Sequence, residues 1–268
     1  MKTMIALLML LTSGGLVAQE VWVLTTRYYN ALENPANARL ERVCLHKGFM
    51  KMVTGDLSTV MNIAKGEIIY INSSNLSYWQ GTPQRFNREA RAALEQMISE
   101  KLLDTPSNQQ EQMRAMYNEM LNTWFSSDVG SAPGARHFTV RRVRGGEIVS
   151  GFAAELYSVY EHGIELEKLW IAPALNIAKD FDFVSLSHFL NQLSGGAYSS
   201  SFENSMEYFN LITKGYPVRV QMVKADGMEY ISEVVEAKRI PYSHNLFAIP
   251  SNHSPSTLSG VGVWDAFR

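Results

Sequence analysis

The chain has 268 residues, of which 46% are hydrophobic and 19% charged, and its formal net charge is −2. This length is enough to bury a substantial core, and the near-neutral charge gives no electrostatic reason to expect a nucleic-acid partner. The single cysteine, Cys44, excludes an internal disulfide, and its apolar neighbours indicate a buried, inert thiol rather than a reactive one. We therefore expect the hydrophobic core alone to stabilise the fold.

Residues 1–18 have the features of a secretory signal peptide. Lys2 supplies a short positive start, residues 4–11 form an apolar run too short to cross a bilayer, and small residues precede Gln19. We predict cleavage near Ala18 or Gln19 and export of the mature chain. The alternative is a buried N-terminal helix, but strand-like alternation begins directly afterwards. No later stretch approaches the ~20 apolar residues of a transmembrane helix.

The mature chain opens with a pattern that is typical of β-strands. Residues 20–26 form a first predicted strand, followed by a polar loop through residue 37. Two hairpins are then predicted, the first from residues 39–46 and 49–54 and the second from residues 67–71 and 76–79. Up to residue 80 the alternation predicts an antiparallel β-meander.

After residue 80 the apolar period changes from two to that of a helix. Thr82-Pro83 is a helix start, and Asp104-Thr105-Pro106 ends the first predicted helix. A capping-box pattern at residues 107–110 opens a second helix with a wide apolar stripe. The stripe contains Met113, Met116, Tyr117, Met120, Leu121, Trp124 and Phe125. Core packing is the default interpretation of such a stripe, and an adaptable binding surface is the alternative.

The second half of the chain again alternates strands with helices. A strand at residues 136–144 leads into a long hairpin at residues 145–173, which begins at Gly145-Gly146 and turns at residues 161–163. Two more predicted helices and a terminal hairpin follow. The helices carry residues 183–193 and 202–209, and the hairpin pairs residues 216–223 with 229–239 around Ala225-Asp226-Gly227. Residues 246–250 form a last apolar element, and we expect residues 251–268 to be a loosely ordered tail.

This order of elements predicts a single α+β domain over residues 19–250. Its main element is a large curved antiparallel sheet, an open half-barrel, whose concave face is covered by inserted amphipathic helices. We expect the two helices after residue 80 to lie antiparallel. The methionine-rich stripe of the second should then lie across the concave face, near Trp22, Tyr157 or Trp170.

The sequence gives no basis for an enzyme. The six histidines are scattered without metal-ligand spacing, and nucleophile-elbow, zinc-protease and phosphate-loop motifs are absent. We therefore predict no catalytic residue, no metal and no cofactor. A basic cluster around His137 fits an edge strand that is protected by charge better than it fits an anion site.

Several stretches together resemble the lipoprotein-carrier (LolA-like) superfamily, and most closely an uncharacterised exported domain family within it. These stretches are the strand at residues 47–52, the strand pair around residues 70–79, the hairpin of residues 151–173 and the ending at residues 215–250. The resemblance implies an open barrel lidded by helices and a periplasmic carrier or binding protein for an apolar, lipid-like ligand. It also implies a cargo-control residue at Lys51, a position where the carriers have an arginine.

The predicted ligand site is the space between the sheet and the helices. Its candidate lining residues are aromatic residues of the strands and the apolar stripe of the second helix: Trp22, Tyr157, Trp170, Met113, Met116, Tyr117, Met120 and Trp124. The alternative hypothesis is a structural or interaction domain of the envelope, with a fully packed core and an envelope protein as its partner. The sequence leaves both hypotheses open.

Overall fold

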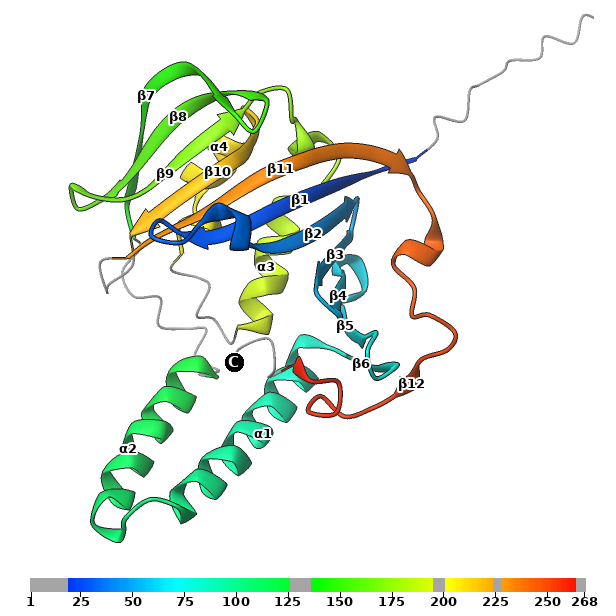
Figure 1. The fold of residues 1–268 in the computed structure, drawn as a ribbon, viewed down its shortest axis with the longest axis vertical. Helices are drawn as coiled ribbons and strands as arrows, with labels where there is room; N and C mark the ends of the chain where they lie inside the picture. Colours follow the sequence, from blue (N-terminus) through cyan, green and yellow to red (C-terminus); the bar gives the residue numbers. More distant parts are fainter. Residues whose placement is uncertain (1–18, 126–135, 195–200, 224–227, 264–268) are drawn as a thin grey trace, which may run out of the picture.

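A computed structural model describes residues 19–125, 136–194, 201–223 and 228–263. The predicted signal peptide and the predicted turn at residues 225–227 lie outside these ranges. The described strands form a single twelve-stranded sheet in the order β12-β6-β5-β4-β3-β2-β1-β11-β10-β9-β8-β7 (Figure 1). Every pairing is antiparallel except the short parallel contact between β12 and β6.

The elements confirm the predicted α+β fold with a large, open antiparallel sheet. The helices are α1 (Pro83–Leu103), α2 (Ser107–Trp124), α3 (Phe183–Leu193) and α4 (Met206–Ile212). The strands are β1 (Glu20–Asn30), β2 (Arg39–His46), β3 (Phe49–Thr54), β4 (Leu57–Asn62), β5 (Glu67–Asn72), β6 (Ser77–Gly81), β7 (Phe138–Val149), β8 (Phe152–Glu161), β9 (Ile164–Ala172), β10 (Tyr216–Val223), β11 (Glu229–Pro241) and β12 (Ser254–Pro255).

Two strands differ from the sequence prediction at the N-terminal half of the sheet. Strand β1 continues to Asn30, four residues beyond the predicted end, because its last residues pair with β11. Strand β4 was not predicted. Its polar residues weaken the alternation, but Val60 and Met61 are buried, and the strand pairs with both β3 and β5. Pairing on both sides thus makes a strand of a segment with a weak local pattern.

The predicted boundary at Gly145-Gly146 was wrong. These glycines lie inside β7, next to register shifts between β7 and β8, and the chain reverses at Ser150-Gly151 instead. Both turn residues have positive φ, 48° for Ser150 and 87° for Gly151, which is the conformation that a tight hairpin turn requires. The predicted turn at residues 161–163 is confirmed, with His162 and Gly163 between β8 and β9.

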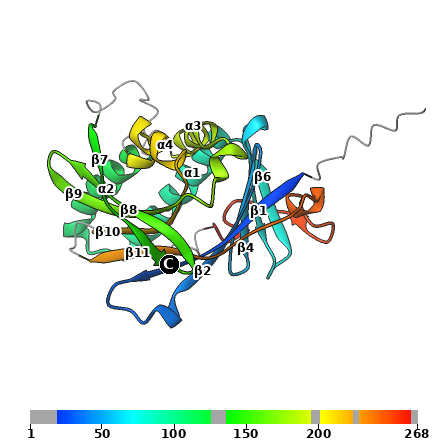
Figure 2. The same ribbon diagram turned by 90° about the horizontal axis from the view of Figure 1, so that it is seen from above.

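The sheet is strongly curved, and α3 lies against it between its two ends (Figures 1 and 2). The largest core cluster joins the sheet to α3 through Leu186 and Phe189, and it also includes Trp79 and Ala90 of β6 and α1. Two smaller clusters bury the opposite sides of individual strands. One packs Phe247 against β1 to β5, and the other packs Phe202 and Leu211 against β8 and β9. The sheet is therefore covered on parts of both faces.

The expected loose tail is instead part of the core over residues 251–263. Strand β12 adds to the edge of β6, and Leu258, Val261 and Val263 are at most 2% exposed. Asn72 and Asn75 side chains donate hydrogen bonds to the carbonyls of Val261 and Gly260 at 2.9 and 3.0 Å. Three apolar residues among many serines and glycines suffice to anchor the segment, because each occupies a fully buried position.

Helices α1 and α2 form the predicted antiparallel pair. Thr82 accepts a hydrogen bond from the Arg85 amide and Pro83 begins α1, as the sequence predicted. The predicted cap at the start of α2 is absent, because Ser107 is already helical and Pro106 precedes it without a side-chain cap. In Figure 1 the pair extends away from the sheet, with its connecting turn at the far end.

Candidate functional site

The methionine-rich stripe of α2 does not lie across the concave face near Trp22, Tyr157 or Trp170, so that prediction was wrong. Only the base of the helix pair reaches the main core, where Leu121 is buried and Phe125 packs against the core cluster. The connecting break spans three residues, so α1 and α2 cover each other, while α3 and residues 258–263 fill the core beneath the sheet.

Most of the stripe remains accessible on the projecting helix pair. Met116 is 55% exposed, whereas Met113, Tyr117 and Met120 are half-buried. The Met113 sulfur accepts a contact from the Thr105 hydroxyl at 3.8 Å, which places it at the far end of the pair. These four candidate residues therefore share one helix face that a single neighbouring helix covers only in part. Trp124 belongs to the last turn of α2.

The three aromatic candidates on strands occupy separate places. Trp22 and Trp170 are buried in the main core cluster, whereas Tyr157 belongs to the cluster beneath α4. The Trp22 indole donates to Asp180 at 2.9 Å, and the Arg239 guanidinium lies 4.4 Å from its ring centre. The hydroxyl of Tyr157 donates to Glu155 at 2.8 Å. Trp22 and Trp170 are thus packed core residues at different positions of the sheet, and Tyr157 lies in another cluster.

Lys51, the predicted cargo-control residue, lies on the outer side of its strand. Its neighbours Met50 and Met52 pack against the main core, so Lys51 points to the opposite face. There its ammonium group donates to the Leu246 carbonyl at 3.0 Å, and burial lowers its pKa below the ordinary lysine value. This contact connects the segment around Leu246, which follows β11, to β3. The sheet itself separates the Lys51 side chain from the interior of the half-barrel.

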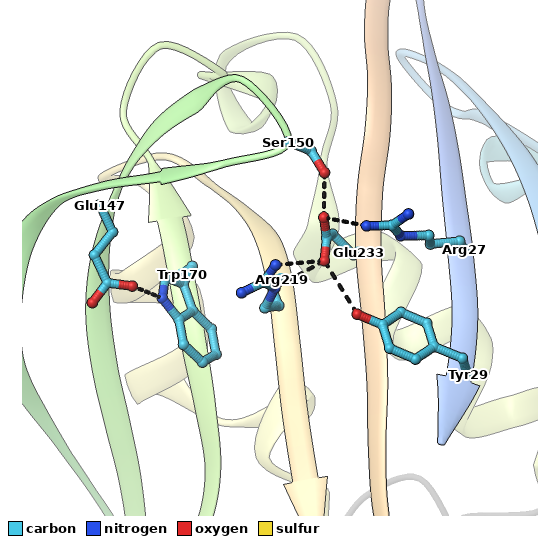
Figure 3. Close-up of polar contacts among 7 residues, drawn as sticks. All are labelled: Arg27, Tyr29, Glu147, Ser150, Trp170, Arg219 and Glu233. Carbon is cyan, nitrogen blue, oxygen red and sulfur yellow. Dashed lines mark hydrogen bonds and ion pairs between the residues drawn. The ribbon is translucent and has the colours of Figure 1, made fainter. Parts of the chain in front are cut away.

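A buried carboxylate, Glu233, is the centre of a polar cluster that the sequence analysis did not predict (Figure 3). Its side chain is 1% exposed and lies between two arginines, one on each neighbouring strand. Arg27 donates to one carboxylate oxygen at 2.9 Å, and Arg219 donates twice to the other at 2.9 and 2.7 Å. The hydroxyls of Tyr29 and Ser150 also donate to this carboxylate.

The cluster joins three strands and a turn from different parts of the sequence. Arg27, Arg219 and Glu233 come from β1, β10 and β11, and Ser150 comes from the turn between β7 and β8. Beside them, Arg219 also lies over the Trp170 ring at 5.4 Å, and the Trp170 indole donates to Glu147. Figure 3 shows these side chains on one face of the sheet.

The electrostatics of Glu233 favour a structural function. Burial alone would raise its pKa, but the hydrogen bonds from Ser150 and Arg219 and the two positive charges hold the pKa below its ordinary value. The carboxylate is thus ionised, and its two oxygens accept hydrogen bonds from Arg27, Tyr29, Ser150 and Arg219. We interpret the cluster as a clamp that fixes the relative positions of β1, β10, β11 and the β7–β8 turn.

One signal in the sequence could have located the ion pair between Arg219 and Glu233. Asp226 is the centre of the predicted terminal hairpin, and Arg219 and Glu233 are each seven residues from it. A tight turn centred there places the two residues opposite each other, as the observed register does. The partnership with Arg27 and Ser150 has no such signal, because it depends on strands brought together only by the complete sheet.

Two of the six histidines are found at structural positions. His46 contacts the Glu20 carbonyl at 2.9 Å and stacks on Tyr242 with ring centres 4.3 Å apart, while His162 lies in a turn. Within the described ranges, no three histidine, cysteine, aspartate or glutamate residues lie close enough to hold a metal ion. In the same ranges, no helix combines the length and the apolar character needed to cross a bilayer.

The architecture defined by this sheet and its helices is the open, helix-covered half-barrel that the lipoprotein-carrier resemblance predicts. No protein-family model matches the chain, and no curated protein is similar to it in sequence. Among solved structures, a LolA superfamily protein from Nitrosomonas europaea has 11% identity and a TM-score of 0.26, over 86% of this chain and 89% of that chain.

Two further similar structures are of MucB. The complex of MucA and MucB from Pseudomonas aeruginosa has 10% identity and a TM-score of 0.36, over 88% of this chain and 57% of that chain. MucB alone has 9% identity and a TM-score of 0.35, over 88% and 59%. The chain thus spans less than two thirds of the MucB chains. At these identities and TM-scores, ligands and partners cannot be transferred to this chain.

Proposed function

We propose that the chain is an exported, non-enzymatic binding protein of the cell envelope that carries an apolar, lipid-like ligand. The observation that supports the proposal is the projecting helix pair, whose methionine-rich stripe is only partly covered by its neighbouring helix. Methionine side chains are flexible and polarizable, and they suit a surface that must adapt to an acyl chain. Lipid carriage also accounts for the resemblance of the sequence to lipoprotein carriers.

Fluorescent fatty-acid binding to the purified mature protein tests this proposal. We expect Met116→Gln to weaken binding roughly 5- to 30-fold, corresponding to the ~1–2 kcal/mol lost when a methionine no longer buries its apolar surface. Stability should change little, because Met116 is 55% exposed. Arg114→Gln, on the exposed polar side of the same helix, is the matched control. A parent protein that does not bind the probe would contradict the carrier proposal.

The second candidate is an envelope interaction domain with a packed core. It is favoured by the continuous core between the sheet, α3 and residues 258–263, which has no need of a ligand to bury its apolar surface. In that case the partner of the α2 stripe would be another envelope protein. Met120→Ala separates the candidates: Met120 is half-buried on the projecting helix, so its truncation should change stability little in either case, and it should weaken fatty-acid binding only if the chain carries a lipid.

A further inference from the structure

A cleft of about 720 Å³ opens at the rim of the sheet, away from the projecting part of α2. It lies between the β2–β3 turn, the short helical segment Ile63–Lys65, and the start of α3 with the segment Ile177–Lys179 that precedes it. This volume is within the range of small-molecule sites. Phe181 and Phe189 are almost fully buried and form an apolar part of the wall.

Helix α3 presents a polar face to this cleft. Ser185, His188 and Gln192 follow one another at spacings of three and four residues, so they lie on one side of the helix. Leu186 and Leu190 lie on the other side and pack into the core. The cleft therefore combines an apolar wall with a row of hydrogen-bonding side chains.

Two lysines stand at the opening of the cleft, and their charges are not neutralised by ion pairs. Lys47 and Lys179 line both this cleft and a neighbouring one of about 510 Å³, so they lie where the two meet. Neither ammonium group makes a hydrogen bond or ion pair to a residue that the structure describes.

The carboxylates of the cleft are already engaged. Asp180 accepts hydrogen bonds from Trp22 at 2.9 Å and from Arg239 at 2.7 Å. Asp182 caps α3, where it accepts from the Ser185 amide at 3.0 Å and from the Ser185 hydroxyl at 2.7 Å. Asp180 is thus paired with Arg239, and Asp182 with the start of α3, whereas the two lysines are charged side chains of this cleft without a partner among the described residues.

The backbone fixes the position of Lys47, the first residue of the two-residue turn between β2 and β3. Its φ is +46°, a left-handed conformation that is less favourable for a residue with a side chain than for glycine. The strain is held by a parallel bridge between Lys47 and Phe181, which connects the β2–β3 turn to the segment before α3. Glycine would be unstrained at this position, and Gly48 is the next residue. Ser150 and His162 adopt the same conformation in their hairpin turns, so the turn and the bridge together fix Lys47 at the opening of the cleft.

We infer that this rim cleft binds the anionic group of a small amphiphile, a carboxylate or a phosphate. Lys47 and Lys179 contact the anion, His188 and Gln192 supply further hydrogen bonds, and the apolar part of the ligand packs against Phe181 and Phe189. The inference goes beyond the proposed carrier function, because the cleft is distinct from the α2 stripe and its residues act without it.

Titration calorimetry on the mature protein provides the test. Its probes are dodecanoate, dodecyl phosphate, dodecyltrimethylammonium and inorganic phosphate, with each amphiphile below its micelle concentration. We expect one or both anionic amphiphiles to bind at least tenfold more tightly than the cation. The stronger of the two identifies the headgroup, and inorganic phosphate alone should bind more weakly than dodecyl phosphate. Lys47→Gln and Lys179→Gln should each weaken anion binding roughly 3- to 10-fold, as expected for charge-assisted contacts at a partly exposed site.

Lys65→Gln is the matched control. Lys65 is an exposed lysine next to Ile63 and Ala64 of the cleft, but it does not line the cleft, so binding should not change. Lys47→Gly should relieve the strained turn and stabilise the fold while still weakening binding, which separates a ligand role from a folding role. Met116→Gln should leave binding at this site unchanged. Equal affinity for the anionic and cationic amphiphiles, no binding of either, or an equal effect of Lys65→Gln would overturn the inference.

Discussion

Glu233 contributes to the stability of the sheet because it is buried between two arginines. Neither arginine is fully buried, so each can still contact water, whereas the carboxylate depends entirely on its protein partners. An ionised group buried in this way stabilises the sheet only while all its donors remain in place. Glu167 on β9 shows the opposite situation, since it is buried beside another acid, Glu203, and not beside an arginine.

Replacing Glu233 by glutamine should destabilise the protein by about 2–3 kcal/mol, because hydrogen bonds to a charged group are lost and two arginines lose their counter-charge. Urea unfolding measures the change. Glu236→Gln is the control, since Glu236 is half exposed and solvent screens its ion pair with Lys238, so its loss should change stability much less. Equal effects of the two substitutions would show that the cluster is not a clamp.

Glu167 should make stability fall as pH rises. Burial, and then repulsion from Glu203, raise its pKa to about 8, whereas the unfolded chain releases this proton near its ordinary pKa of about 4.3. The folded state therefore binds the proton more tightly. Its contribution is complete below about pH 4 and is lost as the pH rises to about 8.

Glu167→Gln should remove this pH dependence. Between pH 5 and pH 8 the variant should lose a few kcal/mol less stability than the parent, at about 1.4 kcal/mol per pKa unit. Thermal or urea unfolding at several pH values measures the difference. Glu165→Gln, at a more exposed site on the same strand, is the control, because its pKa is lowered and it stays ionised over this range. Parallel pH profiles for the parent and Glu167→Gln would contradict the expectation.

At the scale of elements, the C-terminal segment is packed and the α1–α2 pair projects, which is the reverse of what the sequence predicted. The segment around β12 was expected to be loose, yet it closes the edge of β6 and fills the core. The apolar α2 was expected to cover the sheet, yet it projects from it with α1 (Figure 1). This arrangement follows from geometry. Two helices joined by a three-residue break pack their apolar faces against each other, so the sheet is not needed to cover those faces.

Leu258→Ala should therefore cost about 2–5 kcal/mol of stability, as for a fully buried leucine. Leu103→Ala is the matched control, since Leu103 is 82% exposed at the tip of the helix pair and should change stability by less than about 0.5 kcal/mol. Differential scanning calorimetry on both variants compares the two sites directly. Indistinguishable melting temperatures would show that the C-terminal segment is loose in solution.

At the scale of the whole molecule, the sheet joins the first strand, β1, to β11 near the C-terminal end of the chain. Glu20 pairs with Pro241, the Tyr242 amide donates to the Gln19 carbonyl at 2.7 Å, and Arg239 forms an ion pair with Glu20. The ordered contacts of the N-terminal strand thus begin at the residues where the sequence predicts cleavage of the signal peptide.

Mass spectrometry of the protein recovered from a bacterial periplasm should find a mature chain that starts at Gln19 or Glu20. Such a chain keeps all the contacts of β1, so its stability should equal that of a protein expressed without residues 1–18. Recovery of the uncleaved chain from the cytoplasm alone would contradict both the export prediction and the proposed envelope function.

Local patterns in the sequence determined most of the strands, three of the four helix positions and the α+β class. They did so because alternation at period two and helical periodicity record which side of each element is buried. The Thr82-Pro83 start of α1, the turn at residues 161–163 and the buried Cys44 all depended on near neighbours, and the structure confirms them.

What only the tertiary structure decided was where these elements meet. The stripe of α2 is equally apolar whether it packs on a sheet or on another helix, so its sequence could not specify its position. Lys51 and Met52 are neighbours in the sequence but lie on opposite faces of the sheet. Lys47 and Lys179, which are 132 residues apart, line one cleft because a bridge joins Lys47 to Phe181. Such contacts depend on the closing of long loops and on the complete sheet, and periodicity along the chain contains no information about them.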